Sequence, residues 1–166
     1  MVVKDDIATI VRQEETLVFS RFDEGTAFGL GTVLRDMGLR ETLPIIVDVR
    51  FWDRPLFYAA LPGSTAANFD WARRKINSVR AYQKSTYRMF LEQGAGARVF
   101  GIDHGLDPAD YAIAGGAFPI RVEGVGVVGV VAVSGLPQRD DHDLVVRGLC
   151  LHLGHDERAL ALGPEG

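Results

Sequence analysis

One ten-residue run constrains the fold of this chain more than any other segment. From Val125 to Ser134 the sequence is almost entirely apolar and rich in valine. Because side chains alternate along a strand, both faces of such a strand are apolar, and both need a cover. Helices of the same chain can cover one face, and a second subunit can cover the other. The run therefore predicts an interior strand of a sheet.

Other β-rich segments predict the rest of this sheet. Ile45–Phe51 and Leu56–Leu61 are separated by a short turn, which predicts an antiparallel hairpin. Tyr111–Val122 predicts another strand. Its Pro119 has no N–H to donate, so this strand is expected at an edge or with a bulge. A short strand is expected at Val99–Ile102.

Apolar residues at helical spacing predict four helices. The first runs from about Asp5 to Phe19, and the second is capped by Asp23 and ended by Gly38. A long helix is expected from about Ala67 to Gln93, and a last one from Arg139 to His152. The order predicts an α/β (α+β) fold, in which helices flank a mostly antiparallel sheet.

Length and composition narrow the class of protein further. The 166 residues fit a single domain spanning residues 1–166. No apolar run reaches the roughly 20 residues that span a bilayer, so no membrane partner is expected. Cys150 is the only cysteine and excludes an internal disulfide. The first ten residues have no apolar signal core, and we predict a cytoplasmic protein.

The distribution of charge argues against a nucleic-acid partner. The net charge is −4, and the one basic cluster, between Arg73 and Arg88, is interleaved with aromatic residues. A nucleic-acid-binding protein needs a concentrated basic face. We interpret the cluster as a solvated helix face.

Two groups of residues resemble a known family, over roughly Ile7 to Cys150. The first is Leu61-Pro62-Gly63-Ser64 with Asn68, Trp71, Arg74-Lys75 and Ser85; the second is Gly115-Gly116-Ala117-Phe118-Pro119-Ile120 with Gly129, Val133-Ser134-Gly135-Leu136, Gln138 and Asp141-His142. Together they resemble the UPF0303 family, a branch of the GlcG-like, HbpS-like heme-degrading-domain superfamily. The resemblance implies a profilin-like fold that assembles into homo-oligomers. It implies no established reaction, and it makes heme one possible cofactor.

Three sequence segments supply the candidate ligand-binding residues. Steps of three and four place one polar and aromatic stripe on the long helix. The turn before the last helix offers free amides and a helix dipole, which favour an anion. Glycines nearby allow close approach of the backbone to a ligand. The candidates are Asn68, Trp71, Lys75, Ser78, Gly115, Gly116, Ser134, Gly135, Asp141 and His142.

Each candidate also has a structural interpretation. The stripe, which continues through Tyr82 to Ser85, suits a subunit interface as well as a pocket. Asp140 or Asp141 can cap the last helix, which would leave His142 on the surface. Asp103-His104 can be an acid–base pair or simply a loop turn. His152, His155 and Cys150 have some features of a zinc site, but they lack a second ligand cluster, so no metal is expected.

Three functions follow from these candidates. The first is an oligomer that binds a small ligand, either an anion or a tetrapyrrole-like cofactor. The second is an enzyme that acts on a small substrate through Lys75 and His142. The third is a non-catalytic assembly or adaptor protein. A deep pocket uniting Lys75 with His142 favours either of the first two, and a flat protein-covered stripe favours the third.

Overall fold

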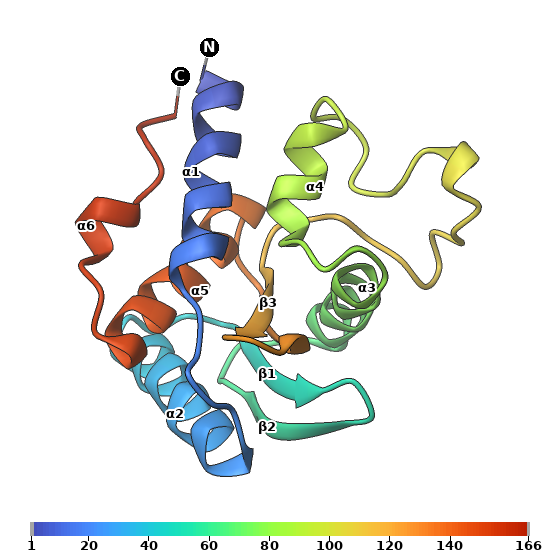
Figure 1. Ribbon diagram of the computed structural model, residues 1–166. Coiled ribbons are helices and arrows are strands. Elements are labelled where there is room, and N and C mark those ends of the chain that lie inside the picture. Colours follow the sequence, from blue (N-terminus) through green and yellow to red (C-terminus); the bar gives the residue numbers. More distant parts are fainter. Residues whose placement is uncertain (1, 166) are drawn as a thin grey trace.

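The computed structural model of the protein describes residues 2–165, and within them it contains six α-helices and one four-stranded sheet (Figure 1). The helices are α1 (Val2–Thr16), α2 (Glu24–Arg40), α3 (Ala66–Tyr82), α4 (Thr86–Glu92), α5 (Gln138–Leu153) and α6 (Glu157–Leu160), and the strands are β1 (Ile46–Phe51), β2 (Arg54–Ala60), β3 (Ala117–Val122) and β4 (Gly126–Ser134). None of these helices is long and apolar enough to cross a membrane.

The sheet is antiparallel throughout, with strand order β2-β1-β4-β3. The predicted hairpin is confirmed as β1 and β2, and the valine-rich run is confirmed as the interior strand β4. Pro119 lies in β3 at one edge, where its missing N–H costs no ladder hydrogen bond. The α+β fold class is therefore as predicted.

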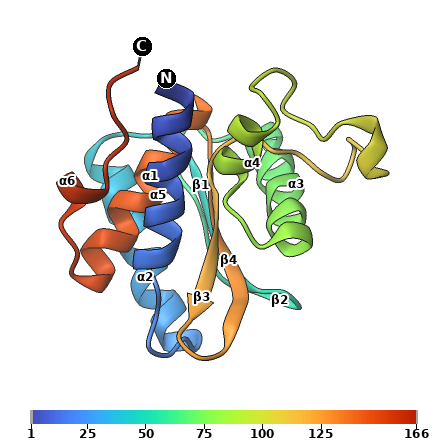
Figure 2. The ribbon, with the colours of Figure 1, turned by 45° about the horizontal axis from the view of Figure 1, so that its top comes forward.

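Helices cover both faces of the sheet, as Figure 2 shows in a view along its edge. Helices α1, α2, α5 and α6 lie on one side, and α3 and α4 lie on the other. On the first side Val131 and Val133 belong to the main core, and on the second Val130 and Ala132 pack with residues of α3 that include Val79. Both faces of β4 are thus covered within the chain, and a second subunit is not needed there.

The predicted long helix is interrupted, and this changes what faces the core. Gln83 adopts the left-handed conformation, with φ of 57°, and its N–H closes α3 on the carbonyl of Val79. Helix α4 then starts in a new direction and packs against α1. Tyr87, which the continuous helix would point to water, is buried next to Ile10.

Smaller differences concern the ends of elements. Val99–Ile102 is not a strand, because residues 93–111 form a loop that protrudes in Figure 1 and contains one short 3-10 helix, Ile102–His104. Residues 112–116 are buried but belong to no strand, and β3 begins only at Ala117. Gly38 does not end α2, which continues to Arg40. The first helix ends at Thr16, three residues earlier than expected.

Candidate functional site

A polar cavity of about 140 Å³ opens where α3, the end of β4 and the first turn of α5 meet. Its walls are Asn68, Trp71, Lys75, Arg98, Ala114, Gly115, Ser134, Gly135, Leu136, Gln138 and Asp141. Seven of these eleven residues are among the ten candidates from the sequence. Segments up to 73 residues apart thus come together, because Lys75 on α3 meets Asp141 in the first turn of α5 beyond the end of β4.

Lys75 forms the floor of this cavity, which we call the α5 pocket. Its ammonium is buried and donates to the carbonyls of Gly115 at 2.9 Å and Val133 at 2.7 Å, and to Asp141 Oδ2 at 3.4 Å. An ammonium has three protons, so every donor is used. Burial lowers the pKa of Lys75, and the nearby carboxylate of Asp141 opposes this shift. The three acceptors keep the amine protonated. Lys75 therefore acts as a structural cation, not as an amine free to attack a substrate.

Asp141, in the first turn of α5, links this helix to the preceding turn and to Lys75. Its Oδ1 accepts the N–H of Leu136 at 3.0 Å, while Oδ2 faces Lys75. Burial raises the pKa of Asp141 to about 6, although Lys75 and the backbone amides lower it. At neutral pH the carboxylate neutralises Lys75, so the pair adds little net charge to the pocket. Asp141 does not cap α5 from outside but joins it to the preceding turn.

The glycines of this region allow parts of the protein to pack closely against each other, rather than allowing a ligand to approach. A Cβ on Gly116, whose φ is +126°, would collide with the Val133 carbonyl and the Lys75 ammonium. A Cβ on Gly135 would collide with the Pro44 carbonyl. Their absent side chains make room for the Lys75 network and the strand end, and Gly116 itself lies behind the pocket.

The ring of Trp71 is covered by two arginine side chains. The guanidinium of Arg74 lies 4.1 Å from its ring centroid, and that of Arg98 lies 4.9 Å away. Arg74 also pairs with Asp70, whereas the Arg98 side chain has no hydrogen bond or ion pair within residues 2–165. Arg98 is therefore the cation at the pocket wall whose charge is not neutralised. No sequence signal marked it, because it lies in the irregular loop.

Several donors around the pocket have no protein acceptor in the part of the chain described. Ser134 is only 3% exposed, yet its hydroxyl makes no hydrogen bond there. Gln138 uses its amide oxygen to accept the Gly115 N–H, and its amide nitrogen is unused. Helix α5 follows Pro137, which gives no side-chain cap, so first-turn amides point outward. Such a set of donors suits an anion.

Asn68 and Ser78 have mainly structural roles on α3. Asn68 accepts the N–H of Thr65 at 2.8 Å in a capping box that starts the helix. Ser78 is buried and donates to the Ala112 carbonyl at 2.7 Å, which fixes the segment before β3. Phe69, an apolar residue of the same helix, is 51% exposed. The buried face of α3 is thus shifted toward Lys75 and Ser78.

His142 is neither on the surface nor in the α5 pocket. It is buried between the rings of Tyr87 and Phe118, and its Nε2 lies 2.8 Å from Gln13 Oε1. Gln13 donates its own amide to the Leu160 carbonyl, so His142 must be the donor. Burial lowers its pKa to about 3, with help from Arg139, and the ring is neutral. The structure therefore does not unite His142 with Lys75.

The remaining histidines do not form a metal centre. Among the residues described, no three histidine, cysteine or carboxylate side chains gather closely enough to hold a metal ion. His152 packs near Phe19, and Cys150 is buried. His104 Nδ1 lies 3.9 Å from Asp103 Oδ1 but 3.3 Å from the Gly101 carbonyl, so the loop turn prevails over an acid–base pair.

Comparison with known sequences identifies the family. Residues 22–150 match the family model described as haem degrading protein HbpS-like. A UPF0303 protein of Mesorhizobium japonicum is 60% identical over 165 residues, which cover 99% of either chain. The chain belongs to the UPF0303 family. It lies within the HbpS- and GlcG-like superfamily, as the two sequence motifs indicated.

Solved structures show the same fold at low sequence identity. The crystal structure of Ybr137w protein has a TM-score of 0.83 and 24% identity, with 92% of each chain covered. The PduOC:Heme complex has a TM-score of 0.64 and 15% identity, and covers 81% of this chain and 99% of that one. At these identities the likeness concerns the fold alone.

Proposed function

We propose that this UPF0303 protein binds a small anionic ligand, a carboxylate or a phosphate, in the α5 pocket. The observation that carries the proposal is a small polar pocket with donors and one exposed cation left over. Ser134, Gln138 and the first turn of α5 offer unused donors, and Arg98 offers a charge that no carboxylate neutralises. Lys75 and Asp141 below them fix the geometry of the site.

The size of the pocket limits the ligand. Pockets for drug-sized ligands measure roughly 300–1,000 Å³, whereas this one measures about 140 Å³. It holds an anionic group and little more. Any larger body of the ligand would lie outside the pocket, beside Arg98 and Trp71.

The test measures anion binding by isothermal titration calorimetry at low salt, with inorganic phosphate and benzoate as probes. We expect saturable binding of at least one probe. Arg98→Ala should weaken it by about tenfold or more, because hydrogen bonds to charged groups contribute roughly 1.5–3 kcal/mol. Arg54→Ala is the matched control, since Arg54 is an exposed arginine on β2. Equal affinities for wild type and Arg98→Ala, or no binding of either probe, would refute the proposal.

Heme is the second candidate ligand, because the superfamily includes a structure described as a heme complex. The α5 pocket is too small for a porphyrin, and no histidine, cysteine or methionine lines it. It fits a propionate group only. We expect a heme titration to give a Soret spectrum without histidine ligation, and phosphate to compete with heme. A bis-histidine or histidine–methionine spectrum that disappears in His104→Ala or His142→Ala would contradict this.

The structure lacks the features on which the enzyme and adaptor hypotheses depended. The enzyme hypothesis relied on Lys75 and His142, which lie in different environments and have no free proton-transfer partner in common. The adaptor hypothesis relied on a flat stripe, but Lys75 and Ser78 are buried. Homo-oligomerisation and a cytoplasmic location remain part of the proposal.

A further inference from the structure

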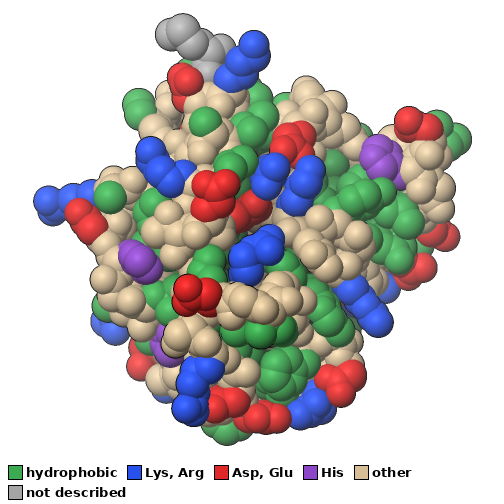
Figure 3. Space-filling model, viewed as in Figure 1, with side chains coloured by type: hydrophobic (Ala, Val, Ile, Leu, Met, Phe, Trp, Pro, Cys, Tyr) green, Lys and Arg blue, Asp and Glu red, His purple; other side chains and the backbone are tan. Residues whose placement is uncertain are grey.

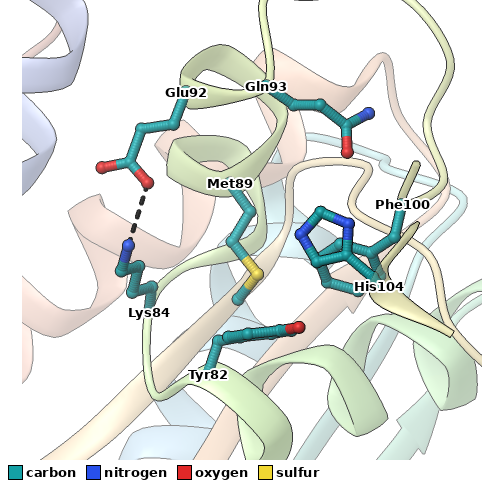
Figure 4. Close-up of a pocket in the computed structure, with 7 residues that line it drawn as sticks. All are labelled: Tyr82, Lys84, Met89, Glu92, Gln93, Phe100 and His104. Carbon is teal, nitrogen blue, oxygen red and sulfur yellow. Dashed lines mark hydrogen bonds and ion pairs between the residues drawn. The ribbon is translucent and has the colours of Figure 1, made fainter. Parts of the chain in front are cut away.

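A second cavity, of about 280 Å³, lies at the other end of α3 (Figure 4). Its walls come from the end of α3, from α4 and from the protruding loop. Trp71 and Tyr82 mark the two cavities on α3, and at 1.5 Å per residue they are separated by roughly 16 Å along the helix. The second cavity, which we call the loop pocket, is therefore a separate site.

Aromatic rings and a thioether form most of its wall. The ring centroid of Tyr82 lies 5.2 Å from that of Phe100 and 6.0 Å from that of His104, and Phe100 and His104 are 5.1 Å apart. Figure 4 shows the sulfur of Met89 directed into the space between Tyr82 and His104. Aromatic rings and sulfur both pack well against another ring at such spacing. These walls suit a flat aromatic body.

The charges at the rim are already paired, which argues for a neutral ligand. Glu92 binds Lys84 at 3.0 Å and Arg88 at 2.7 Å. Gln93 uses both ends of its amide, donating to the Val99 carbonyl and accepting the Gly101 N–H. Neither an anion nor a cation would find an unpaired partner among these residues.

Two polar groups of the wall have no partner within residues 2–165: the Tyr82 hydroxyl, which can donate or accept, and one nitrogen of His104, which can only accept. His104 Nδ1 lies 3.3 Å from the Gly101 carbonyl, which can only accept, so this nitrogen carries the proton. In the neutral ring Nε2 is then unprotonated, and it has no partner within residues 2–165. An N–H or O–H donor on the ligand would satisfy it.

The volume and the surroundings set the size of this ligand. An apolar cavity of about 150 Å³ is large enough for benzene, so 280 Å³ accommodates one or two rings. Ile102, on the same loop, is 98% exposed. Figure 3 shows hydrophobic side chains gathered beside a histidine where the loop meets α3 and α4. An apolar surface thus continues outward from the cavity.

We propose that the loop pocket binds a neutral aromatic molecule of one or two rings that carries an N–H or O–H donor. Its aromatic body packs against the rings of Tyr82 and Phe100 and the thioether of Met89. His104 Nε2 accepts a hydrogen bond from its N–H or O–H group. This site is independent of the anion site proposed above.

The test compares indole with 1-methylindole, which lacks the N–H donor, in saturation-transfer NMR titrations. Wild type should bind indole roughly three- to tenfold more tightly, the value of one net hydrogen bond. In His104→Phe the ring wall is retained but the acceptor is lost, so this preference should disappear. Tyr82→Ala should weaken both probes, and because Tyr82 is 41% exposed its loss should leave the melting temperature nearly unchanged.

Two control variants separate this site from other surfaces. Phe28→Ala removes an exposed aromatic ring on α2 and should leave indole binding unchanged. Arg98→Ala should weaken anions in the α5 pocket but not indole, so either proposal can fail alone. The loop pocket proposal is overturned if indole shows no saturable binding, or if Tyr82→Ala and His104→Phe bind both probes as wild type does.

Discussion

At the residue scale, the Lys75 ammonium determines the geometry of the α5 pocket. Lys75→Met keeps most of the side-chain volume but leaves Asp141 as a buried charge and two carbonyls without their donor. We expect a loss of about 3–5 kcal/mol in the free energy of unfolding at pH 8, as for other broken buried pairs. Lys75 is 1% exposed, so its loss cannot spare the fold as the loss of a surface lysine would.

The pH dependence of this variant provides its control. Burial already raises the pKa of Asp141 to about 6, and removing the cation raises it further. Protonation then relieves the buried charge, so the loss measured by urea denaturation should shrink between pH 8 and pH 5. The double variant Lys75→Met/Asp141→Asn should be more stable than Lys75→Met at pH 8. An equal loss at both pH values would show that the charge is not responsible.

His142 should make the protein sensitive to acid. Its pKa is about 3 in the folded chain and 6.5 in an ordinary environment, so below pH 6.5 the unfolded chain binds the proton more readily. Stability is fully present above pH 6.5 and falls as the pH drops toward 3, by roughly 1.4 kcal/mol per pH unit. Asp141, with its raised pKa, acts in the opposite direction between about pH 4 and 6.

Comparison with His142→Gln isolates this contribution. The glutamine keeps a donor for Gln13 but takes up no proton. We expect the stability of the variant, measured by urea denaturation, to fall less than that of wild type between pH 6.5 and pH 4. Parallel pH profiles for the two proteins would mean that His142 can be protonated without cost.

At the scale of elements, the break between α3 and α4 depends on one strained residue. Gln83 has a φ of 57° and is exposed, and glycine adopts this conformation without a Cβ penalty. Gln83→Gly should raise the free energy of unfolding by about 0.5–1 kcal/mol. Arg80→Gly, at an exposed position inside α3, should lower it by about 1 kcal/mol. If Gln83→Gly also destabilises the protein, the left-handed helix end does not exist in solution.

The same break shows why helix periodicity could not locate the site completely. Periodicity placed Asn68, Trp71 and Lys75 on one face, and the structure does bring them to one pocket. It could not show that the helix stops at Tyr82, because Gln83 is not a residue typical of helix ends. The chain therefore turns from α3 into α4 at a point that no sequence pattern marks, and the sequence did not predict the loop pocket.

At the scale of the whole molecule, exposed aromatic residues outside the pockets predict self-association. Tyr58 on β2 and Phe69 on α3 are both exposed, and their ring centroids lie 6.2 Å apart. They flank the outer edge of the sheet, where β2 has no further strand. Such a patch beside an open edge is typical of a subunit interface.

We expect the wild type to be a homo-oligomer in light scattering at micromolar concentration. Phe69→Lys should lower its mass toward that of the 18.1 kDa chain, because a charge in the interface cannot be paired. Leu151→Lys is a control, since Leu151 is an exposed apolar residue on α5. A monomeric wild type would contradict the prediction.

The extent of the domain also belongs to this scale. The family match covers residues 22–150, yet α1 is tied to α5 by Asp6 and Arg139 at 2.7 Å and by Gln13 and His142. We therefore propose that residues 1–166 form one domain.

The sequence by itself determined the layers of this protein. The continuous apolar run specified β4, and two β-rich segments around a short turn specified the hairpin, because strand pairing and burial follow from local pattern. Pro119 restricted its strand to an edge or a bulge. The motifs shared with the UPF0303 family pointed to the glycine turns and to the start of α5.

Only the tertiary structure decided how the polar residues are used. Burial and hydrogen-bond partners depend on segments distant in sequence: Lys75 meets Val133, His142 meets Gln13, and Arg98 meets Trp71. A sequence pattern gives the face on which a side chain lies, but not the groups it will find there. Those partners turned Lys75 into a structural cation, made His142 a neutral buried ring and left Arg98 as the free charge of the pocket.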